Sequence, residues 1–315
     1  MMKNHHRINT VIFLCMWLLS YSCFSHNNVK KTLLIISDPN SSVHISYINE
    51  FKHQISNYES FSLIYENSNT IKLSNYNTTD YIISIGTTSA NKVLKHKPKA
   101  AVLFTFIPDQ LIYNSISKRN NTNYYSISIT QPAFRVLRLS ELISHNRKIG
   151  LTLGPKTSNY INEFKKLAPS LNAELVIKDY KNFSEPTDAM RESLRESSLY
   201  IATYDSEILN RHSSKWLLYM AYKMNRPVIG YSNAYTKSGA VASLFSTPQQ
   251  FAKQGAKWLI DMTVGTKMKR NTYPKYFTVS INKRVQHVLR MKNVTADWVE
   301  LKLVEMEREP GDENQ

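Results

Sequence analysis

The chain has 315 residues, a formal net charge of +16 and only two cysteines. At roughly 100–200 residues per domain, this length predicts two domains with ample hydrophobic cores. Both cysteines, Cys15 and Cys23, lie near the N-terminus, so the chain beyond them has no disulfide, no thiolate zinc site and no cysteine nucleophile.

The first 25 residues have the layout of a secretory signal peptide. Basic residues precede an apolar run at 11–19, and serines follow where cleavage needs small side chains. The run is shorter than the ~20 residues that cross a bilayer as a helix. We expect cleavage after Ser25 and export to the periplasm. Lipid attachment at Cys23 is the alternative, which we disfavour because Ser20 stands where such signals usually carry leucine.

Apolar strands and amphipathic helices alternate in two series along the chain. The expected strands of the first series lie at 32–37, 61–65, 81–85, 101–106 and 125–129, and those of the second at 148–153, 174–178, 199–203 and 227–230. An intervening helix carries Ile48, Phe51 and Ile55 on one face. The pattern predicts an α/β fold with two doubly wound, Rossmann-like lobes.

Residues 226–260 carry the clearest succession of strand, loop and helix signals in the chain. Two apolar runs, 227–230 and 239–244, read as buried strands of a parallel sheet, with a polar loop between them. A capping box at 247–250, with proline at the first helical position, then starts a helix that Gly265 ends.

The order of these segments resembles the periplasmic substrate-binding proteins of ABC transporters, some of which are assigned to tryptophan or tyrosine. The matching segments are 227–230, 236–243, the helix around Gly255 and 280–282, with a weaker likeness back to about Thr32. The resemblance implies a type I periplasmic-binding fold, whose lobes are joined by a three-crossover hinge. It also implies a small-molecule solute and an inner-membrane ABC permease with its ATPase as partners.

The resemblance also places the crossovers, near 144–148, within 231–238 and near 271–275. Lobe 1 is then 30–143 with 239–270, and lobe 2 is 147–232 with 275–300. Residues 301–315 form a C-terminal extension whose acidic end, from Glu307, we expect to be disordered.

Ligands of open α/β sheets bind beyond the carboxyl ends of strands, where helix N-termini present unpaired N–H groups. The alternative is that residues at these ends merely turn the chain and cap helices. The strand ends give these candidate ligand-binding residues: Ser37, Asp38, Gly86, Thr87, Thr88, Ser89, Thr105, Asp109, Pro155, Thr157, Ser158, Tyr204, Asp205, Tyr231 and Ser232.

Three groups of these residues have a more specific expectation. The turn at 86–90 resembles the family's Gly-Thr-Pro-Ala turn, which suits a ligand carboxylate, although Thr88 replaces the proline. Asp205 matches the aspartate of the family's Asp-Asn pair and would receive a ligand ammonium, or else cap the following helix. Tyr204 and Tyr231 would stack on a flat ligand, or else simply pack.

Catalysis finds little support in the sequence. There is no HExxH, G-x-S-x-G, P-loop or G-x-G-x-x-G motif, and no group of residues has metal-ligand spacing. We therefore predict no enzyme, no cofactor and no metal. The expected protein is a monomeric periplasmic solute-binding component of an ABC uptake system. The alternative is a ligand-sensing or scaffolding envelope protein of the same fold.

The basic charge gathers in two lysine-rich clusters, at 92–99 and at 267–270. Such clusters are usually solvated faces, and an anionic partner is the alternative. No nucleic-acid partner is expected, because the chain reads as exported and lacks interleaved aromatic and basic residues.

Overall fold

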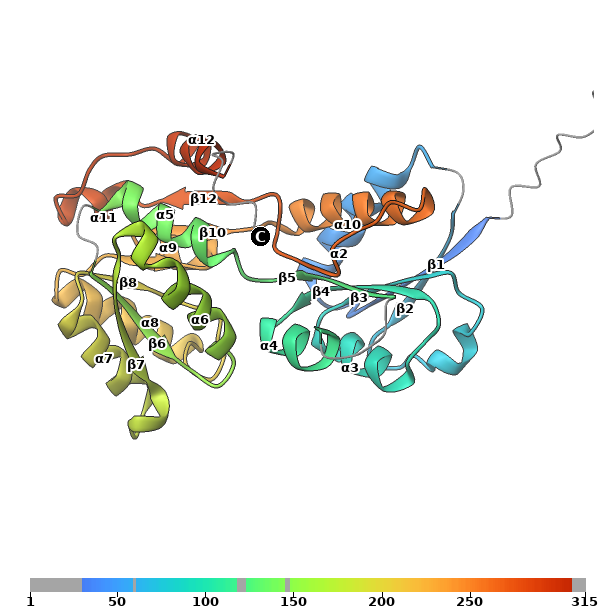
Figure 1. The fold of residues 1–315 in the computed structure, drawn as a ribbon, viewed down its shortest axis with the longest axis horizontal. Coiled ribbons are helices and arrows are strands. Elements are labelled where there is room, and N and C mark those ends of the chain that lie inside the picture. Colours follow the sequence, from blue (N-terminus) through green and yellow to red (C-terminus); the bar gives the residue numbers. More distant parts are fainter. Residues whose placement is uncertain (1–29, 59–60, 118–122, 145–147, 308–315) are drawn as a thin grey trace, which may run out of the picture.

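The structure, a computed structural model, describes residues 30–58, 61–117, 123–144 and 148–307. The expected signal peptide with Cys15 and Cys23, and the tail from residue 308, lie outside the described residues. The rest forms two α/β lobes that lie side by side (Figure 1).

The first lobe is built on a six-stranded sheet in the order β11-β5-β4-β3-β1-β2, with every neighbouring pair parallel. Leu34 and Ile36 point to one face and Leu33 and Ile35 to the other, so both faces are covered. Its strands are β1 (Lys31–Ser37), β2 (Phe61–Asn67), β3 (Tyr81–Ile85), β4 (Ala101–Ile107), β5 (Tyr124–Ser128) and β11 (Asn271–Thr272).

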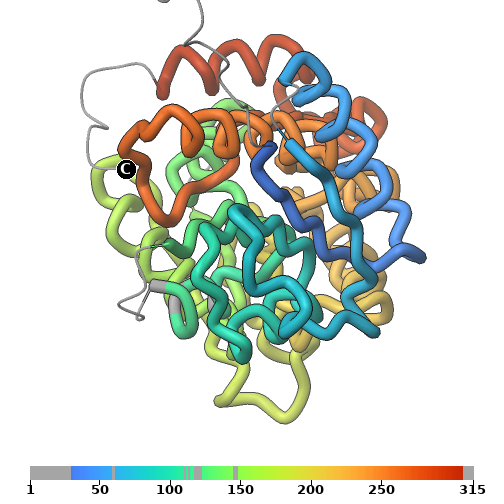
Figure 2. Tube along the Cα trace, turned by 90° about the vertical axis from the view of Figure 1, so that its right-hand side faces the viewer, coloured from blue at the N-terminus to red at the C-terminus, as the bar shows by residue number. Residues whose placement is uncertain are grey.

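Helices α2 (Ser42–Ile55) and α10 (Pro248–Thr263) cover one face of this sheet, and α3 (Thr87–His96) covers the other. The short α4 (Asp109–Leu111) follows β4. Although about 200 residues of sequence separate α2 from α10, the two helices lie side by side (Figures 1 and 2). The predicted capping box is present. The Thr247 Oγ1 accepts a hydrogen bond from the Gln250 N–H, and the Gln250 Oε1 accepts one from the Thr247 N–H.

The second lobe has a six-stranded sheet in the order β12-β10-β9-β8-β6-β7, parallel except for the β10–β12 pair. Its strands are β6 (Lys148–Leu153), β7 (Glu174–Asp179), β8 (Leu199–Ile201), β9 (Val228–Gly230), β10 (Ala242–Phe245) and β12 (Thr278–Ile281). The predicted fold class, two doubly wound α/β lobes, is confirmed.

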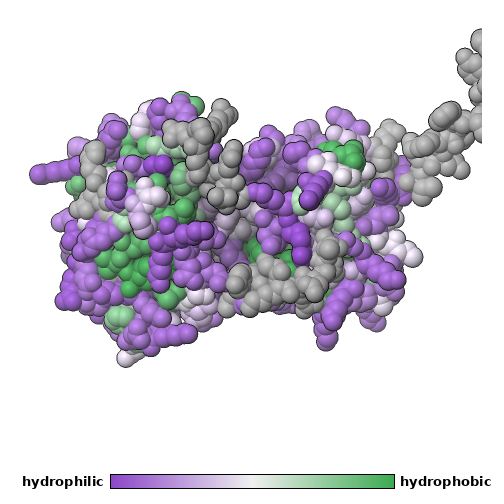
Figure 3. All heavy atoms as spheres, in the orientation of Figure 1, coloured by the Kyte–Doolittle hydropathy of each residue, from purple (hydrophilic) through white to green (hydrophobic). Residues whose placement is uncertain are grey.

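Both faces of the second sheet carry helices. One face packs against α5 (Ala133–Ile143), α6 (Ser158–Leu167) and α12 (Ala296–Met306), and the other against α7 (Pro186–Glu196), α8 (Arg211–Lys223) and α9 (Asn233–Ser238). The short α11 (Lys283–Val288) precedes α12. The molecular face seen in Figure 3 is largely hydrophilic, with hydrophobic residues gathered mainly over the second lobe.

Two of the three predicted crossovers are misplaced. Helix α5 packs its Leu137, Leu139 and Ile143 in the core of the second lobe, so the first crossover is at 129–132 rather than 144–148. Strand β10 pairs with β9 and β12, so the second crossover is at 246–247. The predicted loop at 231–238 lies within the second lobe and contains α9. Apolar periodicity shows that an element is buried but not which sheet it is buried against.

The third crossover lies at 273–277, between β11 of the first sheet and β12 of the second, where 271–275 was expected. Lobe 1 is therefore 30–128 with 248–272, and lobe 2 is 133–245 with 278–307. Residues 301–307 are not an extension, because α12 packs on β12 and α5 and buries Leu303. Glu307, expected in a disordered tail, forms an ion pair with Arg135.

Candidate ligand-binding site

A cavity of about 260 Å³ lies between the two lobes, beside the crossovers. It opens at the carboxyl ends of β8, β9 and β10, where the topology of an open α/β sheet places ligands. The second lobe and the crossovers supply Ile129, Thr130, Gln131, Val136, Tyr160, Ile201–Tyr204, Ile229–Ser232 and Leu244–Ser246; the first lobe supplies Val43, Phe106, Pro248 and Phe251.

Aromatic rings line the cavity from both lobes. Tyr204 and Tyr231 of the second lobe lie with ring centroids 5.3 Å apart and planes at 80°. Phe106 and Phe251 of the first lobe have centroids 4.6 Å apart. Burial, reinforced by the neighbouring Tyr235, raises the pKa of Tyr231 well above its usual value, so its hydroxyl stays neutral at any physiological pH. The four rings offer flat apolar surfaces to a solute placed between the lobes.

Phe106 reaches the cavity through an unusual backbone conformation. Its φ is +55°, in the left-handed region that residues other than glycine rarely adopt, and the pairing of β4 with β5 shifts register between Phe104 and Ile107. Such strain costs of order 1–3 kcal/mol and tends to cluster at functional sites. Phe106 is therefore held in the cleft at a cost to folding.

The cavity lining contains no charged side chain within the described part of the chain. The polar side chains of the lining carry hydroxyl or amide groups, and they are Thr130, Gln131, Tyr160, Thr203, Tyr204, Tyr231, Ser232 and Ser246. A buried charge without a partner is strongly unfavourable, so this lining favours an uncharged part of a ligand. A flat apolar group with one or two hydrogen-bonding atoms fits this lining best.

Of the residues predicted from strand ends, Tyr204, Tyr231 and Ser232 line this cavity. Asp205 does not, although it is adjacent to Tyr204. It is 1% exposed, and its two carboxylate oxygens accept the backbone N–H groups of Lys156 at 2.9 Å and of Glu207 at 3.0 Å. In this conformation Asp205 joins two loops through backbone N–H groups, and it does not cap the following helix either, because the N-cap residue of α8 is Asn210.

The predicted residues of the β6–α6 turn also serve the turn itself. The Thr157 Oγ1 accepts the Gly154 N–H at 2.9 Å, and Thr157 is buried. Pro155 is half-buried, and Ser158 is exposed as the first residue of α6. A Cβ on Gly154 would lie 2.4 Å from the Asp205 carboxylate, so glycine is required for the close approach of these two loops.

The turn before α3 is formed as predicted but lies outside the cavity lining. Gly86 has a φ of +85° and is the N-cap residue of α3, with Thr87 and Thr88 exposed in the first turn. Ser89 is buried, and its hydroxyl donates to the carbonyl groups of Ile85 and Gly86 at 2.8 and 2.9 Å. Its side chain is thus unavailable to a ligand here.

Sequence reasoning missed a histidine near the same edge of the first lobe. His44 lies against Gly86, and its Nδ1 accepts the Asp38 N–H at 3.1 Å. Burial lowers the pKa of His44, against an opposing effect of Asp38. Ser37 and Thr105 are both buried behind this edge, and the Thr105 hydroxyl has no hydrogen-bond partner among the described residues.

Asp109 lies in a second cavity, of about 190 Å³, together with Tyr160, Glu163 and Tyr273. The hydroxyls of Ser128 and Thr130 donate to Asp109, and the Tyr273 hydroxyl donates to Glu163 at 2.5 Å. Burial raises the pKa of Asp109 and of Glu163, and Asp109 raises that of Glu163 further. The two carboxyl groups come from different lobes, Asp109 from α4 and Glu163 from α6.

The rings that sequence reasoning missed are Phe106 and Phe251. Their positions could have indicated the site, since Phe106 ends a predicted strand and Phe251 follows a predicted helix cap. They were missed because apolar residues at such positions are usually part of the hydrophobic core. Within the described ranges, no group of three His, Cys, Asp or Glu residues is placed to hold a metal ion. No helix of the described segments is both long and apolar enough to cross a membrane.

Solved structures similar to this chain include substrate-binding proteins, at low sequence identity. A substrate-binding protein with adhesive properties from Clostridium difficile, in a ligand-free, open structure, has a TM-score of 0.66 and 14% identity over 84% of this chain and 96% of its own. A Streptococcus pneumoniae ABC domain in complex with L-Trp has a TM-score of 0.57 and 13% identity over 84% and 95%. A conserved domain protein from Vibrio cholerae has a TM-score of 0.58 and 15% identity over 87% and 98%.

No curated protein matches the chain. The family model described as ABC transporter substrate binding protein matches residues 41–294, which include nearly all of both lobes. The match confirms the resemblance noted in the late strands and helix, and it extends across the crossovers and the inter-lobe cavity. The chain therefore belongs to the ABC transporter substrate-binding protein family.

Proposed function

We propose that this protein is the periplasmic solute-binding component of an ABC-type uptake system, and that it closes its two lobes on a small organic solute with an aromatic ring. The observation that carries the proposal is the inter-lobe cavity lined by Tyr204 and Tyr231 on one side and by Phe106 and Phe251 on the other. Its volume of about 260 Å³, just below the ~300–1,000 Å³ of typical ligand sites, suits a small solute.

Closure follows from the placement of these rings on different lobes. A ligand that contacts both pairs of rings at once has more contacts when the lobes approach, so its differential affinity shifts the population toward the closed form. The closed form is then what an inner-membrane permease, driven by its ATPase, would recognise. The S. pneumoniae domain in complex with L-Trp supports an aromatic amino acid as the first solute to test.

Mass spectrometry of protein purified from the periplasm with its native solute tests the proposal directly. The N-terminus of that protein should be near His26, as the expected signal peptide requires. Genes for a permease and an ATPase beside its own would separate this role from sensing or scaffolding. An aliphatic or fully polar solute would contradict the aromatic site.

Calorimetry with L-tryptophan and L-tyrosine then tests the two pairs of rings. Phe106→Ala and Tyr231→Ala each remove one ring from the cavity, which should weaken binding by roughly tenfold to a hundredfold, since a buried aromatic contact contributes about 1.5–3 kcal/mol. Tyr222→Ala is the control, because Tyr222 is on α8 at 61% exposure. Equal affinities of all three variants would place the ligand elsewhere.

A further inference from the structure

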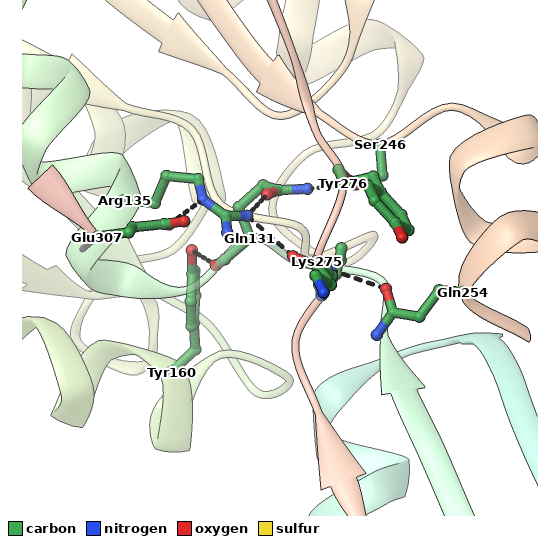
Figure 4. Close-up of polar contacts among 9 residues, drawn as sticks. Gln131, Arg135, Tyr160, Ser246, Gln254, Lys275, Tyr276 and Glu307 are labelled. Carbon is green, nitrogen blue, oxygen red and sulfur yellow. Dashed lines mark hydrogen bonds and ion pairs between the residues drawn. The ribbon is translucent and has the colours of Figure 1, made fainter. Parts of the chain in front are cut away.

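One polar network joins all three crossovers, and Arg135 is its centre (Figure 4). Arg135 lies in the first turn of α5 and is 4% exposed. Its Nη1 donates to the Gln131 Oε1 at 2.5 Å, in the first crossover, and to the Pro274 carbonyl at 3.0 Å, in the third. These two hydrogen bonds hold the Arg135 side chain between the first and the third crossover.

The second crossover is joined to the other two through Ser246. The Gln131 Nε2 donates to the Ser246 Oγ at 2.7 Å, and the Ser246 hydroxyl donates to the Tyr276 carbonyl at 2.5 Å. The Tyr160 hydroxyl, from α6, also donates to the Gln131 carbonyl at 2.6 Å. A backbone change in one crossover therefore disturbs the hydrogen bonds of the other two.

The charge of Arg135 is balanced from the C-terminal end of the described chain. Its Nε lies 2.5 Å from the Glu307 Oε1, and its guanidinium stacks 4.2 Å from the centre of the Phe277 ring. Removing one partner of a buried ion pair leaves an uncompensated charge, which is strongly unfavourable. The strength with which Arg135 holds the crossovers thus depends on Glu307.

The third crossover is held from both lobes within three consecutive residues. Gln254, on α10 of the first lobe, donates to the Tyr273 carbonyl at 3.1 Å and accepts the Lys275 N–H at 2.8 Å. Arg135, from the second lobe, holds Pro274 between them. Proline also fixes φ at this point. A hinge motion needs φ and ψ changes in such connecting residues, so these opposed contacts resist it.

We propose that Arg135 and Glu307 form a latch that stabilises the lobe arrangement seen here, so that the end of α12 sets the balance between conformers of the hinge. The latch rests on the proposed closing motion of the lobes, but it acts in the ligand-free protein and touches no solute. Weakening the latch should raise the population of the other conformer, which is the one that a ligand selects.

Distance measurements between two spin labels test the latch in ligand-free protein. Cys15 and Cys23 are replaced by serine, and labels are attached at Lys95→Cys on α3 and Lys165→Cys on α6, both exposed positions on different lobes. Glu307→Gln keeps the shape of the side chain and removes its charge. We expect a second distance population to rise roughly tenfold relative to the parent, within the usual range of a single coupled contact.

Glu305→Gln is the matched control, because Glu305 lies on α12, is 48% exposed and pairs with Lys302 on the surface. It makes the same change in charge and should leave the distance distribution as in the parent. Ser246→Ala breaks the link between crossovers without altering any charge, and it should act in the same direction as Glu307→Gln. It keeps the test decisive if the charge variant folds poorly.

Two results would overturn the latch, and they differ in what they say of the proposed function. If a second population exists but is equally small in all variants, the lobes move and the latch is wrong. If none of the variants shows a second population, even with a saturating solute that calorimetry shows to bind, the closing motion is wrong as well.

Discussion

The carboxylate of Asp205 accepts a hydrogen bond from the backbone N–H of Lys156 at 2.9 Å, across 49 residues of sequence. Its other oxygen accepts the Glu207 N–H at 3.0 Å, and the side chain is 1% exposed. One side chain thus joins the loop after β8 to the loop after β6, beside the cavity. Both loops carry strand ends of the second lobe, so Asp205 helps to shape the site without lining it.

Asp205→Ala should therefore destabilise the ligand-free protein. It removes the shared acceptor of two part-buried backbone hydrogen bonds, at about 1–3 kcal/mol, which lowers the Tm by roughly 2–10 °C for a chain of this size. Thermal unfolding followed by circular dichroism measures the shift. Glu207→Ala is the control, since its pair with Lys156 at 3.2 Å is on the surface and contributes little. An unchanged Tm together with weaker solute binding would instead make Asp205 a ligand contact.

Because α2 and α10 are in contact at Tyr47 and Gly255, Gly255→Ala should change the stability in opposite directions in the parent and in a Tyr47→Phe variant. A Cβ on Gly255 would lie 2.2 Å from the Tyr47 hydroxyl oxygen but 3.3 Å from the ring carbon that bears it. Gly255→Ala alone should destabilise the protein by about 1–3 kcal/mol through overpacking. In a Tyr47→Phe background the clash is largely gone, and alanine should stabilise the helix by up to about 1 kcal/mol.

Denaturant unfolding of the four chains in this cycle measures the coupling. Tyr47→Phe alone should be neutral or stabilising, because the Tyr47 hydroxyl is buried without a hydrogen-bond partner among the described residues. Additive effects of the two substitutions would show that the helices separate to accommodate the methyl group.

The buried carboxyl of Asp109 predicts a stability that falls as the pH rises. Its pKa is raised by burial, so the folded state retains a proton that the unfolded state has already released. Stability is then unaffected below the ordinary carboxyl pKa of about 4 and declines as the pH rises from there through the folded value. Asp109→Asn removes this titration.

The measurement for Asp109 is the unfolding free energy of parent and variant between pH 4 and pH 7. The variant should gain stability relative to the parent as the pH increases. Any constant offset reflects altered hydrogen bonds with Ser128 and Thr130. Glu163→Gln should also make the decline with pH shallower than in the parent, because the pKa of Glu163 is itself raised by burial and by Asp109, and the variant removes that titration. A free-energy difference that stays constant across this range would contradict the prediction.

The sequence by itself determined the fold class, the strands and the family resemblance. Short continuous apolar runs such as those that became β1, β3 and β6 can be recognised from neighbouring residues alone, and the cap at Thr247 is complete within four residues. Tyr204 and Tyr231 were also found, because the carboxyl end of a strand is a position that sequence can mark.

Only the tertiary structure decided which sheet each element joins and which polar group a buried residue meets. Helix α5 and strand β10 belong to the second lobe, although both were expected in the first. The sequence shows that a segment is buried, but not which surface it packs against. Asp205 accepts hydrogen bonds from backbone N–H groups, and Arg135 pairs with Glu307, 172 residues away in the sequence. Such pairings depend on chain segments that meet only after folding, and no local period encodes them.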